Sequence, residues 1–385
     1  MNASSPHHSD YGNVDTHLLS DTTNKALQKQ INKMQAAGKK SILILSCAAN
    51  AYNADDMSEY LQSLSVQVFG GLFPSIVYEN NKYDTGTVLI GYDFEMPVAI
   101  FENPSPDGLY DNMEECRTRL NDSSNLMILI DGLSGHVEIF IEKLYQELGS
   151  GLQVIGGGAG SLDFVHRPCL FSNRGMLQDA ALVISLSNGM RSAAGHGWEI
   201  LDGPYLVTEA DGHKIISLNF QPAFELYRDV VERISDHRFT TDNFFDVSKY
   251  FPFGISEMGT DLLVRDPIVC DGKTITCVGE LPTNATVYIL KGEANYLIDS
   301  AKQAAQEALT MLEHESSAPN TTTIIFDCIS RLLYLDTRFP EELHGINGFM
   351  PAQASLVGAL SLGEIANEDG GPIQLLNKSF VIGSY

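Results

Sequence analysis

One histidine in this sequence has the surroundings of a cofactor ligand. His196 lies between two glycines and closely precedes Trp198, the single tryptophan of the chain. A neutral imidazole is the usual proximal ligand of haem iron, and flanking glycines would let a bulky macrocycle approach. The simpler alternative is a histidine that hydrogen-bonds to backbone at a domain seam, and a single histidine favours that alternative.

A second set of residues near the end of the chain could bind a charged ligand: Cys328, Arg331, Glu364 and Asn377. A guanidinium can hold a carboxylate with two N–H groups, and Glu364 would then take an ammonium. We expect Arg331 at a strand end, where it could meet Glu364, and a structural ion pair is the commoner result. Cys328 could be a reactive thiol, although its apolar neighbours favour burial.

A glycine-rich run, GGGAGS at Gly156–Ser161, invites comparison with nucleotide-binding loops. The dinucleotide fingerprint needs a glycine at its sixth position, and with Gly158 as the first position the sixth holds Asp163. Strand-like sequence follows instead of a helix. The run therefore indicates a tight turn or a close backbone contact, and we keep its glycines as candidate ligand contacts: Gly156, Gly157 and Gly158.

Catalytic and metal-binding patterns are weak. Ser134 in DGLSGH resembles a nucleophile elbow, but a helix N-cap occupies the same place far more often. The neighbours Asp163 and His166, like the pair Asp211 and His213, have no further metal ligands nearby in the sequence. We therefore do not expect an enzyme.

Composition excludes several classes of partner. The chain has 385 residues, with 24 Lys and Arg against 49 Asp and Glu, and a formal charge of −25. This charge repels phosphate backbones and anionic lipids, so we expect neither nucleic acid nor membrane as a partner. Residues 1–39 are predicted to be a flexible polar tail and lead-in without a secretory signal. Six scattered cysteines predict free thiols in a cytoplasmic protein.

The periodicity of apolar residues predicts repeated units. Ser41–Ala49 should be a strand buried on both faces, followed by a helix and three strands. The same order returns from Asn125–Gly132 onward, so residues 40–190 are predicted to hold two copies of one unit. Residues 321–385 show the order more weakly.

Residues 191–385 should form a second module. Residues 188–196 have the small, polar composition of a boundary. A hairpin, a helix that begins after Pro222 and a long helix that ends near Leu312 are expected, with residues 235–260 as a loop. The predicted fold class is mixed α/β: repeated strand-helix-strand-strand-strand units, then a second mixed-sheet module.

Several segments together resemble the FIST family, which has an N-terminal and a C-terminal module. They are the run Gly195–Val231, CISR at Cys328–Arg331 and LGE at Leu362–Glu364. The resemblance implies a non-catalytic signal-input protein that feeds histidine kinases, cyclases or chemotaxis receptors. Amino acids are a ligand class associated with the family, and Arg331 and Glu364 would hold them.

Phe69–Gly86 and Phe164–Gly175 resemble the stand-alone bacterial members of the family that bind haem and sense nitric oxide. This resemblance implies haem as cofactor and a separately encoded hybrid histidine kinase as partner. His196, with Trp198 beside it, is then the first choice of iron ligand and His166 the second. An amino-acid sensor is the alternative, an enzyme of unknown class a third, and a homo-oligomer stays open.

Overall fold

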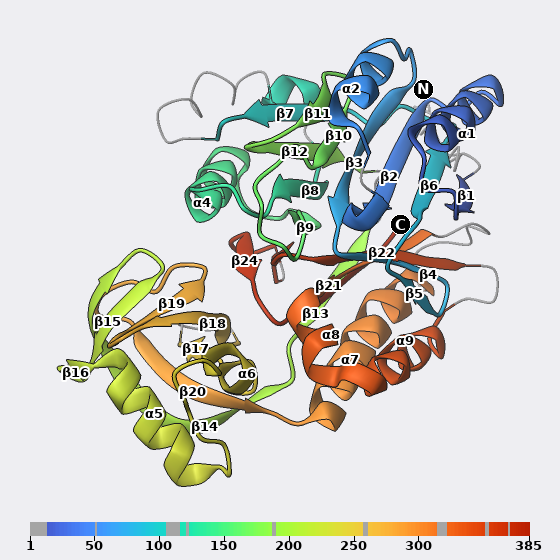
Figure 1. Ribbon diagram of the computed structural model, residues 1–385. Coiled ribbons are helices and arrows are strands. Elements are labelled where there is room, and N and C mark those ends of the chain that lie inside the picture. Colours follow the sequence, from blue (N-terminus) through green and yellow to red (C-terminus); the bar gives the residue numbers. More distant parts are fainter. Residues whose placement is uncertain are drawn as a thin grey trace, which may run out of the picture.

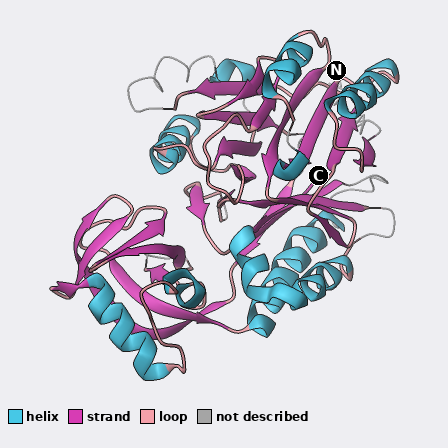
Figure 2. Ribbon diagram, in the orientation of Figure 1, coloured by secondary structure: helices cyan, strands magenta, loops and turns pink. Residues whose placement is uncertain are grey.

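The computed structural model describes residues 14–50, 52–104, 116–120, 123–186, 190–256, 261–313, 322–350, 354–368 and 370–385. Within these residues the chain forms three six-stranded sheets and one seven-stranded sheet. Figure 1 shows two bodies, a large core and a smaller body around the seven-stranded sheet, and Figure 2 shows helices on the periphery of both. The predicted mixed α/β fold class is confirmed.

The core is built from three copies of one unit. Each copy begins with a strand that is buried at every position, because a continuous apolar run suits a strand with neighbours on both sides. These first strands are β2 (Ser41–Cys47), β8 (Asn125–Asp131) and β21 (Thr322–Cys328). Each is followed by helix: α2 (Ala54–Gln62), α4 (Val137–Leu148), and α8 (Ile329–Leu335) with α9 (Phe339–Asn347). Short 3-10 turns follow β2 and α8, at Ala48–Asn50 and Asp336–Arg338.

The helices return the chain to a second strand that runs parallel to the first. These strands are β3 (Gln67–Phe73), β9 (Gln153–Ala159) and β22 (Ser355–Ser361). A hairpin follows in each copy: β4 (Ser75–Tyr78) and β5 (Asn81–Tyr83), β10 (Leu170–Ser172) and β11 (Gly175–Leu177), and β23 (Glu364–Ala366) and β24 (Gln374–Leu376).

A closing strand then pairs antiparallel with the first strand of each copy: β6 (Thr87–Tyr92), β12 (Ala180–Ser185) and β25 (Phe380–Ser384). An outer strand pairs with each closing strand: β1 (Val14–Leu19), β7 (Val98–Glu102) and β13 (Arg191–Gly195). Two long helices belong to the first and third copies. Helix α1 (Asn24–Ala36) follows β1, and helix α7 (Ala294–Glu313) precedes β21. The third copy, which the sequence shows only weakly, is thus a complete repeat.

Each repeat gives its hairpin to the sheet of another repeat. Strand β4 of the first repeat pairs with β22 of the third, β10 of the second with β3 of the first, and β23 of the third with β9 of the second. The exchange is cyclic, so the three sheets interlock. The exchange also crosses the boundary expected at residues 188–196, because β4 pairs with β22 and β9 pairs with β23.

The repeated glycines have a steric explanation. A Cβ atom at Gly70 would lie 1.9 Å from the backbone oxygen of Ile44, and one at Gly156 would lie 1.9 Å from that of Ile128. The third repeat has Gly358 at the same register position. The glycines therefore lie inside the second strand, not after it, and permit its close approach to the first strand.

A small barrel is inserted between β13 and α7. The strands of the barrel are β14 (Trp198–Asp211), β15 (Lys214–Leu218), β17 (Phe253–Ile255), β18 (Leu263–Asp271), β19 (Thr274–Val278) and β20 (Thr286–Gly292), with β16 (Gln221–Pro222) at the edge. The ring closes because the long strand β14 pairs first with β20 and then with β15. Helix α5 (Ala223–Ile234) buries one face against it, beginning after Pro222 as predicted.

Two expectations about irregular segments are wrong. Residues 14–36 form β1 and α1 rather than a tail, because α1 buries Leu27, Ile31 and Met34 in the core. The segment expected as a loop at 235–260 contains α6 (Phe244–Ser248) and β17. Residues 1–13 of the predicted tail lie outside the described residues.

Two expectations drawn from composition concern membranes and cysteines. Among the described residues, helices with the length and apolar character of a membrane span do not occur. All six cysteines are free thiols, and five of them are buried.

Candidate functional site

The junction between barrel and core gathers most of the residues singled out from the sequence. His196 and Trp198 lie on the crossing from β13 into the barrel strand β14. Cys328 ends β21, Arg331 lies one turn into α8, and Glu364 begins β23. The sequence predicted Arg331 at a strand end. The structure places it on helix α8 instead.

Arg331 is fully buried, and its guanidinium is already engaged. The expected ion pair with Glu364 is not formed, because Arg331 pairs with Glu342 of α9 and lies 3.2 Å from Asp327. Its N–H groups face five acceptors, namely the carboxylates of Glu342 and Asp327 and the backbone oxygens of His196, Leu297 and Lys378. Both terminal nitrogens donate hydrogen bonds, and Nε faces Asp327 in an ion pair without a hydrogen bond, so the guanidinium has no side left for a ligand carboxylate.

One carboxyl group beside Arg331, that of Asp327, has a raised pKa. Burial, with the neighbouring charge of Glu342, raises the pKa of Asp327 well above its usual range. A neutral Asp327 can donate to Glu342, whose Oε1 otherwise has no hydrogen-bond partner among the described residues.

Glu364 is also neutral at pH 7. Burial raises its pKa to about 8, although Oε1 accepts from the Ser361 hydroxyl at 2.8 Å and Oε2 lies 3.3 Å from the Ser379 N–H. A neutral acid does not attract an ammonium group, so Glu364 does not fit its expected role. Burial raises the pKa of the Cys328 thiol as well, which keeps it protonated and unreactive.

Buried charges connect this cluster to the barrel. Lys378 lies in the turn before β25, and its Nζ is 3.1 Å from Oδ1 of Asp266 on barrel strand β18. The Ser330 hydroxyl donates to Asp266 at 2.7 Å. From the barrel, Arg265 donates to the backbone oxygen of Leu375 at 3.0 Å. The barrel is therefore held on the core by specific polar contacts, of which the pair of Lys378 and Asp266 is buried.

His196 is neutral, as a metal-binding histidine must be, but it is in the wrong tautomer to bind a metal through Nε2. Burial lowers its pKa to about 4, so the imidazole is neutral at pH 7. Its Nδ1 accepts the N–H of Trp198 at 2.9 Å, which leaves the ring proton on Nε2. Binding iron through Nε2 needs the proton on Nδ1, and that tautomer loses the bond from Trp198. The residues would hold haem iron only with that change of tautomer and with helix α7 moved away from the flanking glycines.

The glycines beside His196 serve packing. A Cβ at Gly195 would lie 2.5 Å from Oγ of Ser300, and one at Gly197 would lie 2.4 Å from the backbone oxygen of Tyr296. Helix α7 therefore fills the room that these glycines were expected to leave for a macrocycle. Trp198 is buried against Tyr334 and donates its indole N–H to the backbone oxygen of Lys378 at 3.1 Å.

Two protein-family models together match most of the chain, and the boundary between them falls inside the barrel, between β16 and α5. The model of the FIST N domain matches residues 41–221, and that of the FIST C domain matches residues 223–367. The chain belongs to the FIST family. FIST domains are generally sensor domains of signal transduction. No curated protein is similar enough to this chain to match.

Three glycines of the FIST N domain prove to be packing positions. A Cβ at Gly157 would lie 2.8 Å from that of Ser361, and one at Gly158 would lie 2.4 Å from the backbone oxygen of Leu362. With Gly156 against β8, the run lies in strand β9 and contacts protein on both sides. The close backbone contact predicted from the sequence is therefore present, but it leaves no room for a ligand.

His166 lies apart from the junction, at the carboxyl end of β8 in the FIST N domain. Its Nε2 is 2.7 Å from Oδ2 of Asp131 and 3.3 Å from Oδ1 of Asp179. The sequence pairs His166 with Asp163, whereas the structure pairs Asp163 with Arg167. Sequence spacing missed this group because its three members come from different segments, which only the sheet brings together.

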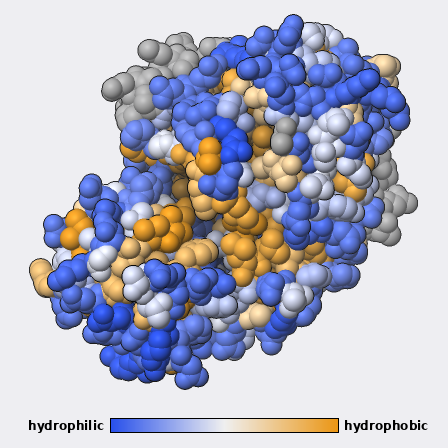
Figure 3. Space-filling model, in the orientation of Figure 1, coloured by the Kyte–Doolittle hydropathy of each residue, from blue (hydrophilic) through white to orange (hydrophobic). Residues whose placement is uncertain are grey.

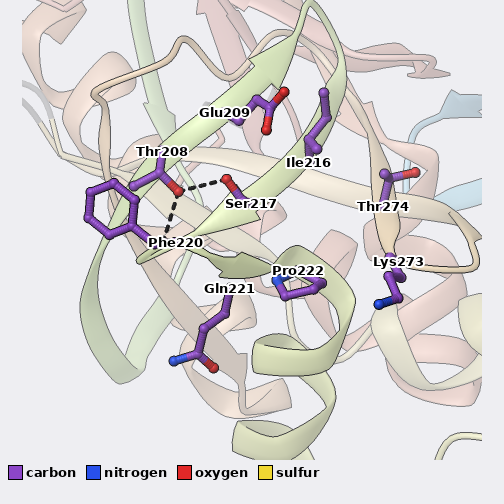
Figure 4. Close-up of a pocket in the computed structure, with 9 residues that line it drawn as sticks. All are labelled: Thr208, Glu209, Ile216, Ser217, Phe220, Gln221, Pro222, Lys273 and Thr274. Atoms are coloured by element: carbon purple, nitrogen blue, oxygen red, sulfur yellow. Dashed lines mark hydrogen bonds between the residues drawn. The ribbon is translucent and has the colours of Figure 1, made fainter.

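The barrel carries a surface hollow of about 440 Å³. It lies between β14, β15, the turn after β18 and the start of α5, and Figure 4 shows the residues that line it. In the floor, the Thr208 hydroxyl contacts that of Ser217 at 2.7 Å and accepts the N–H of Phe220 at 3.0 Å. Glu209 and Lys273 supply one charge of each sign. The full lining is Thr208, Glu209, Ile216, Ser217, Phe220, Gln221, Pro222, Lys273 and Thr274.

Proposed function

We propose that this FIST protein is a non-catalytic signal-input protein that regulates a separately encoded histidine kinase by changing how the barrel docks on the core. The observation that carries the proposal is the buried pair of Lys378 and Asp266, which joins the two bodies. Breaking a buried ion pair costs much free energy, so arrangements in which it is partly broken are unfavourable. Such a pair therefore suits an element with two states. A ligand that prefers one docking state would shift the equilibrium between the two.

The proposed ligand site is the junction itself. Figure 3 shows a hollow between barrel and core with hydrophobic side chains gathered on its walls. Aromatic rings also bridge the two bodies here, since Tyr250 of the barrel lies 5.3 Å from Tyr334 of α8. Sites for small ligands commonly form at such domain seams.

Haem is the ligand that we propose for this site, with His196 as the residue that would hold its iron. Bound haem would supply an iron that takes up nitric oxide. On the protein side, His196 would move its ring proton to Nδ1 and lose the N–H bond from Trp198. Because Trp198 is the first residue of β14, the state of this imidazole is linked directly to the barrel.

The visible absorption spectrum of the full-length protein, purified and supplied with haem, tests this ligand. We expect a Soret band that shifts with nitric oxide, is lost in His196→Ala and is kept in His213→Ala, a control at an exposed barrel turn. A band that survives in His196→Ala would overturn the assignment of this residue. A protein without a band after haem is added would overturn haem as the ligand.

A second candidate ligand is amino-acid-like, and the hollow on the barrel favours it. Glu209 and Lys273 could meet the ammonium and carboxylate of such a ligand. Thermal unfolding in the presence of each amino acid is the test. Stabilisation that is lost in Lys273→Ala but kept in Lys291→Ala would support this second candidate.

Regulation of the kinase needs its own test. The full-length protein, with and without ligand, is added to a purified hybrid histidine kinase, and autophosphorylation is followed with labelled ATP. We expect the rate to change at least severalfold, and the change to be lost in Lys378→Met. An unchanged rate over all histidine kinases of the same cell would contradict the proposed regulation.

A further inference from the structure

We infer that Asp131, His166 and Asp179 form a binding site for a divalent transition-metal ion. One ligand atom from each residue lies within 4.8 Å of the other two. The set offers one imidazole nitrogen and two carboxylate oxygens. Imidazole suits zinc, iron, nickel and copper, whereas magnesium and calcium prefer oxygen alone.

The distances are close to those of a coordinated ion. Tetrahedral zinc with ligands at about 2.1 Å places neighbouring ligand atoms roughly 3.4 Å apart. Nε2 of His166 is already 3.3 Å from Oδ1 of Asp179. Its 2.7 Å contact with Oδ2 of Asp131 would have to lengthen, and Nε2 would have to be without a proton to bind the ion.

A supporting shell fixes the carboxylates. Asp131 is 1% exposed, and its two oxygens accept the backbone N–H groups of Leu133 at 3.1 Å and Asp179 at 2.9 Å. Oδ1 of Asp179 accepts the Ser134 hydroxyl at 3.2 Å. Such outer contacts orient metal ligands in known sites. His166 is about one-third exposed, which leaves a path for an ion and a water ligand.

The second repeat alone carries this group, because it contains an extra loop. Strand β3 is separated from its hairpin by one residue and β22 by two, whereas Gly160–Cys169 lie between β9 and β10. The loop brings His166 to the end of β8, although the other repeats fold without such a loop. Cys47 and Cys328 occupy the place of Asp131 in the first and third repeats.

A bound ion would also fix a hydrophobic loop. Leu162, Phe164 and Val165 precede His166, and they are 43%, 60% and 53% exposed. Coordination of His166 would tie this loop to β8 and so hold its apolar side chains in one place.

Zinc binding to the full-length protein, after treatment with a chelator, tests the site. We expect His166→Ala to bind one zinc equivalent fewer than the unchanged protein, and Asp179→Asn to bind at least tenfold more weakly. Ser134→Ala should weaken binding about tenfold, as loss of an outer contact does. Magnesium at the same concentration should not compete.

His136→Ala is the matched control, because His136 is exposed on the same side of β8 but outside the group. The histidines other than His136 and His166 are present in every variant, so the zinc that they bind adventitiously is the same in all of them. Equal unfolding midpoints without metal would show that the variants fold. If His166→Ala binds zinc with the same stoichiometry and affinity as the unchanged protein, the three side chains are only a hydrogen-bonded group and the inference is wrong.

Discussion

Nζ of Lys378 lies 3.1 Å from Oδ1 of Asp266, and the two side chains are 0% and 3% exposed. The pair joins the last repeat of the core to the barrel. Lys378→Met leaves Asp266 buried without its cation, so we expect the free energy of unfolding to fall by about 3–5 kcal/mol. Urea unfolding is the measurement.

The double variant Lys378→Met with Asp266→Asn should recover at least half of that loss, because no charge is left unpaired. Lys291→Met is the control. Lys291 pairs with Glu293 at the surface, where such pairs contribute about 0–1 kcal/mol. A Lys378 variant as stable as this control would contradict the role of the pair.

Glu364 predicts a pH dependence of stability. Burial raises its pKa from 4.5 to about 8, so between these values the folded protein holds a proton that the unfolded chain releases. The stabilisation is complete below pH 4.5 and is lost as the pH rises towards 8, by at most about 1.4 kcal/mol per pH unit. Glu364→Gln should flatten this fall.

Urea unfolding at pH 5, 6, 7 and 8 would measure the effect. Glu307→Gln, at an exposed position of α7, should show the same pH dependence as the unchanged protein. If Glu364→Gln also follows the unchanged curve, Glu364 is ionised in the folded state and the proposed neutral acid is wrong.

Gly156→Ala should disrupt the core. The added methyl group would lie 1.9 Å from the backbone oxygen of Ile128, so β8 and β9 would have to separate. We expect a loss of about 3 kcal/mol or more, or an insoluble protein. Gly135→Ala, with open space around its Cβ, should unfold thermally at nearly the same temperature as the unchanged protein. Equal melting of both variants would show that the strands can adjust.

Trp198 should report on the junction, since it is the only tryptophan and is 4% exposed. Its ring lies 5.2 Å from that of Tyr334. Tyr334→Ala admits water beside the indole, so the emission maximum should move to longer wavelength by several nanometres. Tyr296→Ala, a half-exposed tyrosine on α7, should leave it unchanged. An unshifted spectrum for Tyr334→Ala would mean that other groups shield the indole.

Local sequence signals predicted the repeated core well. Continuous apolar runs identified the buried strands β2 and β8, and Gly149 marked the end of α4. Strand β1 was missed because VDTHLL has no local strand signal, and only its pairing with β6 makes it one. Tertiary pairing likewise defines the third repeat. The sequence showed the order of its elements, but it could not show the register in which its strands pair.

For the candidate site, too, the sequence predicted which residues matter but not which residues they contact. The sequence brought forward His196, Trp198, Arg331 and Glu364, which do gather at one junction. Their partners could not be predicted, because Arg331 meets Asp327 from the preceding strand and Glu342 from the next helix. The pairing of His166 with Asp131 was equally hidden, since it depends on how a loop crosses the end of a strand.

The exchanged hairpins impose an order on the synthesis of this protein. Tyr78 in β4 pairs with β5 as soon as both are made, but the other edge of β4 has no neighbour until Val357 in β22 has been made. At a translation rate of 5–20 residues per second, that wait is on the order of 15–60 s. During this time the nascent first repeat presents an open sheet edge to other chains. The first sheet itself is complete once β11 has been made, but its hairpin β4–β5 reaches its place only near the end of translation, so chains that stall before the third repeat are exposed to aggregation.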